Sequence, residues 1–282
     1  MLIPHPLRIE IQRTVAAALA EDVGSGDLTA GLIPADARAR ARIITREPAV
    51  LCGSAWVDAT FHALDPNATV SWHVREGETV TADQPLCDIA TDARTLLTAE
   101  RTALNFLQSL SGTATTTQRF VEAVAGTRAK IVDTRKTLPG LRMAQKYAVS
   151  VGGGHNHRIG LFDGVLIKEN HIIAAGSLRA AVEAARRLAP PQAFIEVEVE
   201  NLEELEQALD CGVKMLLLDN MDLDTLHRAV ELTQERAELE ASGGVSLEQV
   251  RSIAETGVHR ISIGGLTKNL QAIDLSLRHI EK

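Results

Sequence analysis

The pattern of apolar and polar positions along the chain changes near Gly112. From about residue 115 onward, short apolar runs alternate with longer stretches in which apolar residues recur at helical spacing. The runs are short and almost wholly apolar, as expected for strands that are covered on both faces. The predicted strands are Lys130–Asp133, Gly164–Ile167, Phe194–Val199, Met215–Leu218, Ala237–Ala241 and Arg260–Ile263. Repeated β-α units of this kind predict a parallel sheet.

Helix signals fill the gaps between these strands. Ser177, Asn201 and Ser246 are predicted N-caps, and Gly212 and Gly257 are predicted helix stops. The spacing leaves room for about six strands, fewer than the eight of a full β/α barrel. An incomplete barrel and an open doubly wound sheet both fit this spacing.

The chain before Gly112 has a different texture. The predicted strands there are Ala41–Arg46, Val70–Arg75 and Leu86–Ile89, and the predicted helices are Ile9–Ala20 and Thr95–Leu110. We therefore expect an N-terminal α/β sandwich domain over residues 1–111 and an incomplete, about six-stranded β/α barrel over 112–282. The last helix is expected to return to the N-terminal domain.

Composition excludes several classes of protein. The chain has 282 residues, is 45% apolar and carries a formal net charge of −8, which disfavours nucleic-acid binding through phosphate contacts. Its three cysteines, Cys52, Cys87 and Cys211, have no metal-ligand spacing and indicate reduced thiols. No apolar run approaches the ~18 residues that span a bilayer. We expect a cytoplasmic enzyme that binds neither nucleic acid nor membrane.

Each predicted barrel strand runs into polar or glycine-rich sequence. In a β/α barrel these carboxyl ends form the active site, so the barrel becomes the favoured fold. The strand ends are Asp133–Thr137, Lys168–His171, Glu196–Glu200, Asp219–Asn220, Ser242–Gly244 and Gly264–Gly265.

Positive charge gathers at these ends, in Arg135, Lys136, His157, Arg158 and Lys168. Unpaired charges are costly to bury, so such a pocket must expect anions. Arginine suits two-pronged recognition of carboxylate or phosphate, whereas lysine serves as a point charge.

Other strand ends carry the complementary groups. Glu198 and Asp219 could bind sugar hydroxyls or a divalent cation. The glycine-rich turns after the last two strands match the usual phosphate site of a barrel.

Single features have ordinary explanations. Gly152–Gly154 is consistent with a flexible turn, His155 and Lys168 with surface residues, and His157 beside Arg158 with a structural pair. Arg101, at the edge of an apolar helix arc, is consistent with a charge lying over apolar surface. A barrel would place the strand-end residues at one edge. The ordinary explanations of these residues then become less plausible as a group, because each would have to hold independently at the same place.

The motifs in their order resemble those of the quinolinate phosphoribosyltransferases, also called carboxylating nicotinate-nucleotide pyrophosphorylases. The matching stretches span nearly the whole chain: Glu21–Thr29, Thr98–Asn105, Asp133–Arg142, Gln145–Val149, Gly152–Arg158, Leu166–His171, Glu196–Val199, Leu218–Asn220, Ala241–Gly244 and Ile263–Lys268. The resemblance implies the two-domain fold above. It also implies a homodimer with shared active sites, Mg²⁺ as cofactor, and the conversion of quinolinate and phosphoribosyl pyrophosphate to nicotinate mononucleotide, pyrophosphate and CO₂ in NAD synthesis.

The same resemblance implies roles for individual residues. Arg135, His157, Arg158 and Lys168 would hold quinolinate, and Arg101 would arrive from the partner subunit. Thr134 and Lys136 would contact substrate, Lys136 on the phosphoribosyl side. The remaining implied positions are Glu198 and Asp219 at ribose hydroxyls or metal, and Ser242, Gly243, Gly244, Gly264, Gly265 and Leu266 at the ribose phosphate. Lys136, Lys168, Glu198 and Asp219 would be the catalytic residues.

Three other functions compete. A lysine at a strand end could form a Schiff base, which would make Lys168 the nucleophile of a lyase. A related phosphoribosyltransferase could act on nicotinate, although the number of cations favours a dicarboxylate. Val74–Ile89 has the hairpin rhythm of a biotin or lipoate carrier, but it contains no lysine to modify.

Overall fold

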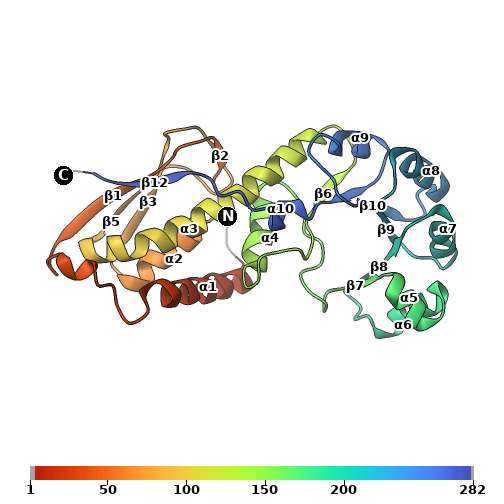
Figure 1. Cartoon of the computed structure of the whole chain (residues 1–282), viewed down its shortest axis with the longest axis horizontal. Helices are drawn as coiled ribbons and strands as arrows, with labels where there is room; N and C mark the ends of the chain where they lie inside the picture. Colours follow the sequence, from red (N-terminus) through yellow and green to blue (C-terminus); the bar gives the residue numbers. More distant parts are fainter. Residues whose placement is uncertain (1–3, 281–282) are drawn as a thin grey trace. The chain divides into compact units, whose positions relative to one another are not determined.

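The computed structural model describes residues 4–280, which form two compact units. Unit 1 comprises residues up to 118 together with 137–153 and the C-terminal segment from 269. Unit 2 comprises residues 119–136 and 154–268. Figure 1 follows the chain through both units.

Unit 1 is built on an antiparallel sheet in the order β12-β1-β5-β3, with a second small ladder of β2 and β4. Its strands are β1 (Arg38–Thr45), β2 (Ala49–Val50), β3 (Thr69–Trp72), β4 (Thr79–Val80), β5 (Pro85–Asp92) and β12 (Leu275–His279). Its helical segments are α1 (His5–Val23), η1 (Ala30–Leu32), α2 (Ser54–Leu64), most of α3 (Ala93–Ala123) and α4 (Arg142–Val151). The predicted strands and both predicted helices of the N-terminal part are confirmed, with shifted ends.

The C-terminal segment returns to unit 1 as a strand, and the prediction of a returning helix is wrong. Residues 275–279 pair antiparallel with β1, with Ile43 opposite Leu277. Leu275 and Leu277 pack against the core that contains Ile43, so the alternation of apolar residues there follows the strand period of two.

Helix α3 extends to Ala123, well beyond the predicted end at Leu110. Gly112, where the pattern of apolar positions changes, lies inside this helix. A Cβ atom at Gly112 would lie 2.0 Å from the carbonyl oxygen of Gln271, so glycine allows the returning C-terminal segment to cross the helix closely.

Unit 2 contains a parallel sheet of six strands within the described residues, in the order β6-β11-β10-β9-β8-β7. Its strands are β6 (Lys130–Val132), β7 (Gly164–Ile167), β8 (Phe194–Val199), β9 (Met215–Asp219), β10 (Glu238–Ser242) and β11 (Arg260–Ser262). Its helices are α5 (Glu169–Ala175), α6 (Leu178–Leu188), α7 (Leu202–Asp210), α8 (Leu223–Thr233), α9 (Val250–Glu255) and α10 (Gly265–Lys268), and α6 to α9 line the outer side of the curved sheet (Figure 1). Each predicted strand of this region is present.

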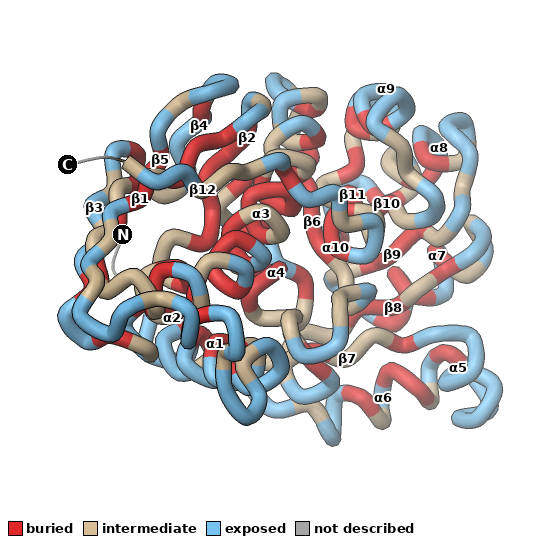
Figure 2. Tube along the Cα trace, turned by 60° about the vertical axis from the view of Figure 1, so that its left-hand side comes forward, coloured by how far each residue is buried: buried red, intermediate tan, exposed pale blue. Residues whose placement is uncertain are grey.

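Burial follows the predicted pattern. The strands of unit 2 are largely buried, and α6 to α8 keep exposed outer faces (Figure 2). Side chains of Ser177 and Asn201 cap α6 and α7 as predicted. The predicted cap at Ser246 is wrong, because α9 begins four residues later and its N-cap, Gln249, makes no side-chain cap bond.

A short segment after the glycine turn lies along the outer edge of β6. The backbone N–H of His155 donates to Ile131, and the backbone N–H of Asp133 donates to His155. These hydrogen bonds fix His155 beside β6. His157 and Arg158 follow two and three residues later, so both lie beside the end of β6.

Among residues 4–280, no helix is long and apolar enough to cross a membrane.

Candidate active site

The carboxyl ends of the unit 2 strands carry the residues that the sequence singled out. Arg135 and Lys136 follow β6, Lys168 follows β7, and Glu198 lies near the end of β8. Asp219 ends β9 and Ser242 ends β10, while Gly264 and Gly265 follow β11. Parallel strands end at one edge, so these positions share one face of unit 2, which we call the strand-end site.

Two guanidinium groups repel each other in the strand-end site. Burial and, after it, repulsion from Arg135 lower the pKa of Arg158 below its ordinary value. Within the described part of the chain, the buried Nε of Arg135 has no hydrogen-bond partner. The carboxylates of Glu196 and Asp163 offset only part of these effects on the pKa of Arg158, and an anion that accepts from both guanidinium groups would stabilise the pair further.

Arg158 is held at two points. Its Nη1 donates to the carbonyl oxygen of Gly164 over 2.9 Å, and its backbone N–H donates to Nδ1 of His157 over 2.8 Å. Asp133, fully buried at the end of β6, accepts from the backbone N–H of His157 and from the side chain of Asn156. The loop that carries Arg158 is therefore fixed by hydrogen bonds on both sides.

Carboxylates and a cation meet at the neighbouring strand ends. Lys168 Nζ forms a close ion pair with Glu198, whose side chain is 15% exposed whereas that of Lys168 is 47% exposed. Asn220 donates from its side chain to Asp219 over 2.7 Å. Glu198 and Asp219 thus lie at the ends of adjacent strands, where carboxylate oxygens suit hydroxyls or a cation.

The glycine turns leave little space for side chains. Gly264 lies against the Lys136 side chain, because a Cβ there would be 2.9 Å from Lys136 Cδ. The hydroxyl of Thr267, on α10, donates to the Lys136 carbonyl oxygen over 2.8 Å. Lys136 is thereby held over the Gly264–Gly265 turn. The Leu266 side chain is buried, so only its backbone is available to a ligand.

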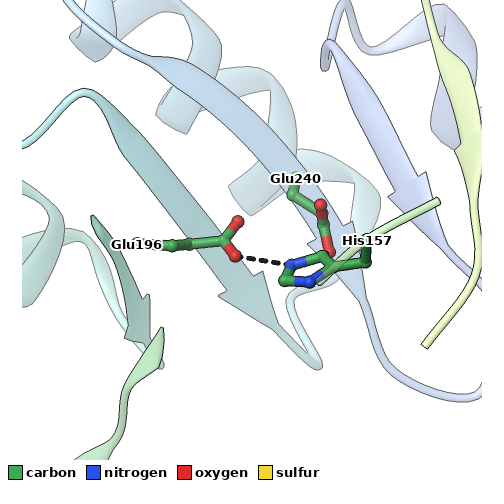
Figure 3. Close-up of side chains that lie close together, drawn as sticks. All are labelled: His157, Glu196 and Glu240. Atoms are coloured by element: carbon green, nitrogen blue, oxygen red, sulfur yellow. Dashed lines mark hydrogen bonds and ion pairs between the residues drawn. The ribbon is translucent and has the colours of Figure 1, made fainter. Parts of the chain in front are cut away.

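A buried cluster lies deeper in the sheet, made of His157, Glu196 on β8 and Glu240 on β10 (Figure 3). His157 Nε2 lies 2.7 Å from Glu196 Oε2 and 3.8 Å from Glu240 Oε1. Burial and the Glu196 charge raise the pKa of Glu240 to about 7. Sequence reasoning missed Glu240, although a charged residue inside a run predicted to be covered on both faces was a signal.

Arg101 lies on α3 in unit 1, where it is exposed. The other predicted site residues belong to unit 2. The predicted role of Arg101 at a partner's site stays a prediction.

A parallel β/α sheet with cations, carboxylates and glycine turns at its strand ends defines the class of protein, a barrel-type enzyme for anionic small molecules. Two family models together match most of the chain: "Quinolinate phosphoribosyl transferase, N-terminal domain" over residues 27–111, and the C-terminal domain of the same family over residues 113–278. The chain belongs to the quinolinate phosphoribosyltransferase family, as its motifs predicted.

Individual relatives agree with the family models. The chain is 44% identical to a carboxylating nicotinate-nucleotide pyrophosphorylase of Mycobacterium leprae, over 94% of this chain and 95% of that one. It is 38% identical to a probable enzyme of the same name from Bacillus subtilis, over 95% and 93%. The solved nicotinate-nucleotide pyrophosphorylase of Francisella tularensis matches with a TM-score of 0.94 and 43% identity, covering 99% of this chain and 98% of that one.

A more distant likeness concerns the fold alone. Human nicotinic acid phosphoribosyltransferase matches with a TM-score of 0.61 at 16% identity.

Proposed function

We propose that this chain transfers the phosphoribosyl group of phosphoribosyl pyrophosphate to quinolinate and releases CO₂, giving nicotinate mononucleotide and pyrophosphate for NAD synthesis. The observation that carries this proposal is the pair Arg135 and Arg158. Repulsion from Arg135 lowers the pKa of Arg158, and the buried Nε of Arg135 has no hydrogen-bond partner among the described residues, so this pair favours a bound anion. The two adjacent carboxylates of quinolinate would supply two anionic groups.

The proposed division of labour follows the strand ends. Arg135, Arg158 and Lys168 hold the two carboxylates of quinolinate. Lys136 and the Gly264–Gly265 turn lie together and serve the phosphoribosyl group. Ser242–Gly244, the turn after β10, serves the ribose phosphate.

The chemistry then needs orientation and charge balance more than covalent catalysis. The pyridine nitrogen bonds to C1 of the ribose as the bond to pyrophosphate breaks. The ring becomes a pyridinium, which accepts the electron pair left behind when the neighbouring carboxylate departs as CO₂. A proton then takes the place of the carboxylate on the ring carbon.

We propose Mg²⁺ as cofactor, with Glu198 and Asp219 as its candidate protein ligands or as partners of the ribose hydroxyls. The donor set fits, since carboxylate oxygens at adjacent strand ends are what a hard divalent cation prefers. Mg²⁺ bound there would neutralise part of the pyrophosphate charge. The ion pair with Lys168 holds the Glu198 carboxylate at this strand end.

We also propose a homodimer in which Arg101 completes the partner's site, and a cytoplasmic location. The exposed position of Arg101 on α3 and its place within a family motif support the first. Three buried, unpaired cysteines among the described residues agree with a reducing compartment. The acidic net charge of −8 agrees with the absence of nucleic-acid partners.

Calorimetric titration with quinolinate and with nicotinate tests the assignment of substrate. We expect wild-type protein to bind quinolinate at least about 10²-fold more tightly than nicotinate, because nicotinate leaves one cation unpaired. Arg158→Lys keeps the charge and loses the two-pronged geometry, so it should weaken quinolinate binding and leave nicotinate binding unchanged. Equal affinity for the two acids in wild-type protein would favour the nicotinate-specific alternative.

A further inference from the structure

The buried cluster of His157, Glu196 and Glu240 has spacing that would admit a metal ion. One ligand atom from each residue lies within 4.8 Å of the others. The cluster lies below the strand-end site and shares no residue with the candidate Mg²⁺ ligands. The hydrogen bonds of the His157 imidazole distinguish a metal site from a chain of hydrogen bonds.

The His157 ring has a defined tautomer. Its Nδ1 accepts the backbone N–H of Arg158 over 2.8 Å, so Nδ1 carries no hydrogen. The hydrogen therefore sits on Nε2, which donates to Glu196 Oε2 over 2.7 Å. A metal at Nε2 would leave neither nitrogen protonated, whereas metal-binding histidines ordinarily donate from their second nitrogen. The tautomer therefore argues against a metal and for a chain of hydrogen bonds.

We infer that Glu196 is a positioning residue for quinolinate binding, acting through His157 on Arg158. By accepting the Nε2 hydrogen, Glu196 keeps Nδ1 free to accept from the backbone of Arg158. Without that acceptor the buried Nε2–H has no partner, so the ring gains by turning away to find one, and this movement breaks the bond from the Arg158 N–H to Nδ1. Arg158 loses one of its two anchors, and its guanidinium no longer has a fixed relation to Arg135.

Because the hydrogen bonds from Glu196 through His157 to Arg158 are buried, they depend on Glu196 itself. Glu196 is fully buried and His157 is 8% exposed, so water cannot readily replace Glu196 as the acceptor. Glu240 Oε1 is too distant at 3.8 Å to accept in its place. The bond to Glu196 gives His157 an indirect role through Arg158, and its predicted direct contact with quinolinate stays a prediction.

Three variants separate this role from simple stability. Glu196→Leu removes the acceptor, Glu196→Gln keeps an acceptor oxygen without the charge, and Glu238→Leu is a matched control at the exposed start of β10. We expect Glu196→Leu to raise the Kd for quinolinate by about tenfold or more, with the Kd for phosphoribosyl pyrophosphate unchanged. Glu196→Gln and Glu238→Leu should bind quinolinate as wild type does.

The tautomer itself can be measured in the unmodified protein. Long-range ¹H–¹⁵N spectra of histidine-labelled protein, assigned with His157→Gln, should show Nδ1 of His157 bare and Nε2 protonated. This measurement uses wild-type protein, so it does not depend on whether a Glu196 variant folds. A proton on Nδ1 in wild-type protein overturns the inference, as does unchanged quinolinate binding in Glu196→Leu or an equal loss in Glu196→Gln.

The inference rests on the proposed function, because quinolinate is the ligand titrated. The two fail in different ways. Wild-type protein that does not bind quinolinate contradicts the proposed function, whereas normal binding by wild type and by Glu196→Leu contradicts the positioning role alone.

Discussion

Gly243 packs so closely against Asn220 that a Cβ atom at 243 would lie 2.2 Å from the Asn220 side-chain oxygen. Gly243 also has a φ of +115°, which disfavours other residues. Gly243→Ala must therefore displace Asn220, which donates to Asp219. We predict an increase of about tenfold in the KM for phosphoribosyl pyrophosphate, with quinolinate binding unchanged.

Gly176→Ala is the matched control for this substitution. Gly176 has a φ of +87°, but a Cβ atom there would meet nothing within 4 Å, so the variant suffers the backbone strain without the contact. Both variants should unfold at lower temperature, and only Gly243→Ala should change the KM. A normal KM in Gly243→Ala would contradict a role for this turn in substrate binding.

Lys168 is predicted to act as a fixed cation. Its ammonium group is paired with Glu198 and, while protonated, has no lone pair to attack a carbonyl. Lys168→Ala should lower kcat/KM for quinolinate by about 10²-fold or more, whereas Lys214→Ala, at the opposite end of β9, should have no effect. Borohydride treatment with carbonyl compounds should give no adduct, and a covalent adduct at Lys168 would favour the lyase alternative.

Stability should depend on pH through Glu240. Its pKa is raised from 4.5 to about 7 by burial and by Glu196, with smaller opposing effects from His157 and Arg260. The folded protein holds this proton more tightly than the unfolded chain, so the contribution of Glu240 to stability is greatest below pH 4.5 and falls as the pH rises toward 7.

Glu240→Gln removes this dependence. Urea unfolding at pH 5 and pH 8 gives the free energy of unfolding of both proteins. The difference between variant and wild type should shift in favour of the variant by roughly 1–3 kcal/mol from pH 5 to pH 8. Parallel stability profiles for the two proteins would mean that Glu240 is not protonated in the folded state near neutral pH.

The proposed homodimer with shared active sites predicts complementation between inactive variants. Arg101→Ala and Lys168→Ala each damage every site of their own homodimer. A mixed dimer would carry one intact site if Arg101 acts on the partner, so a statistical mixture should recover about a quarter of wild-type activity. Co-expressed chains with different tags provide the measurement, and mixed dimers without activity would place Arg101 at the site of its own subunit.

The strands and the strand-end site could be predicted because each signal is local. A strand and its polar end can be recognised from adjacent residues alone, as with the apolar runs that precede Asp219-Asn220 and Ser242-Gly243-Gly244. Parallel β-α topology then brings those ends together without further information.

Long-range packing could not be predicted in the same way. The helix was predicted to end at Leu110, and the structural reason for the glycine at 112, the carbonyl of Gln271 crossing the helix, lies far along the chain. The return of residues 275–279 as a strand depends on an open edge at β1. The cluster of Glu196, Glu240 and His157 depends on three elements that do not neighbour one another in sequence.

The most direct test of the account is the stoichiometry of CO₂ release. Quinolinate labelled in its 2-carboxylate should give one CO₂ for each nicotinate mononucleotide formed, only when phosphoribosyl pyrophosphate and Mg²⁺ are present. Arg135→Ala and Arg158→Ala should reduce both products together. Product formation without CO₂, or CO₂ release that is independent of phosphoribosyl pyrophosphate, would contradict the proposed reaction.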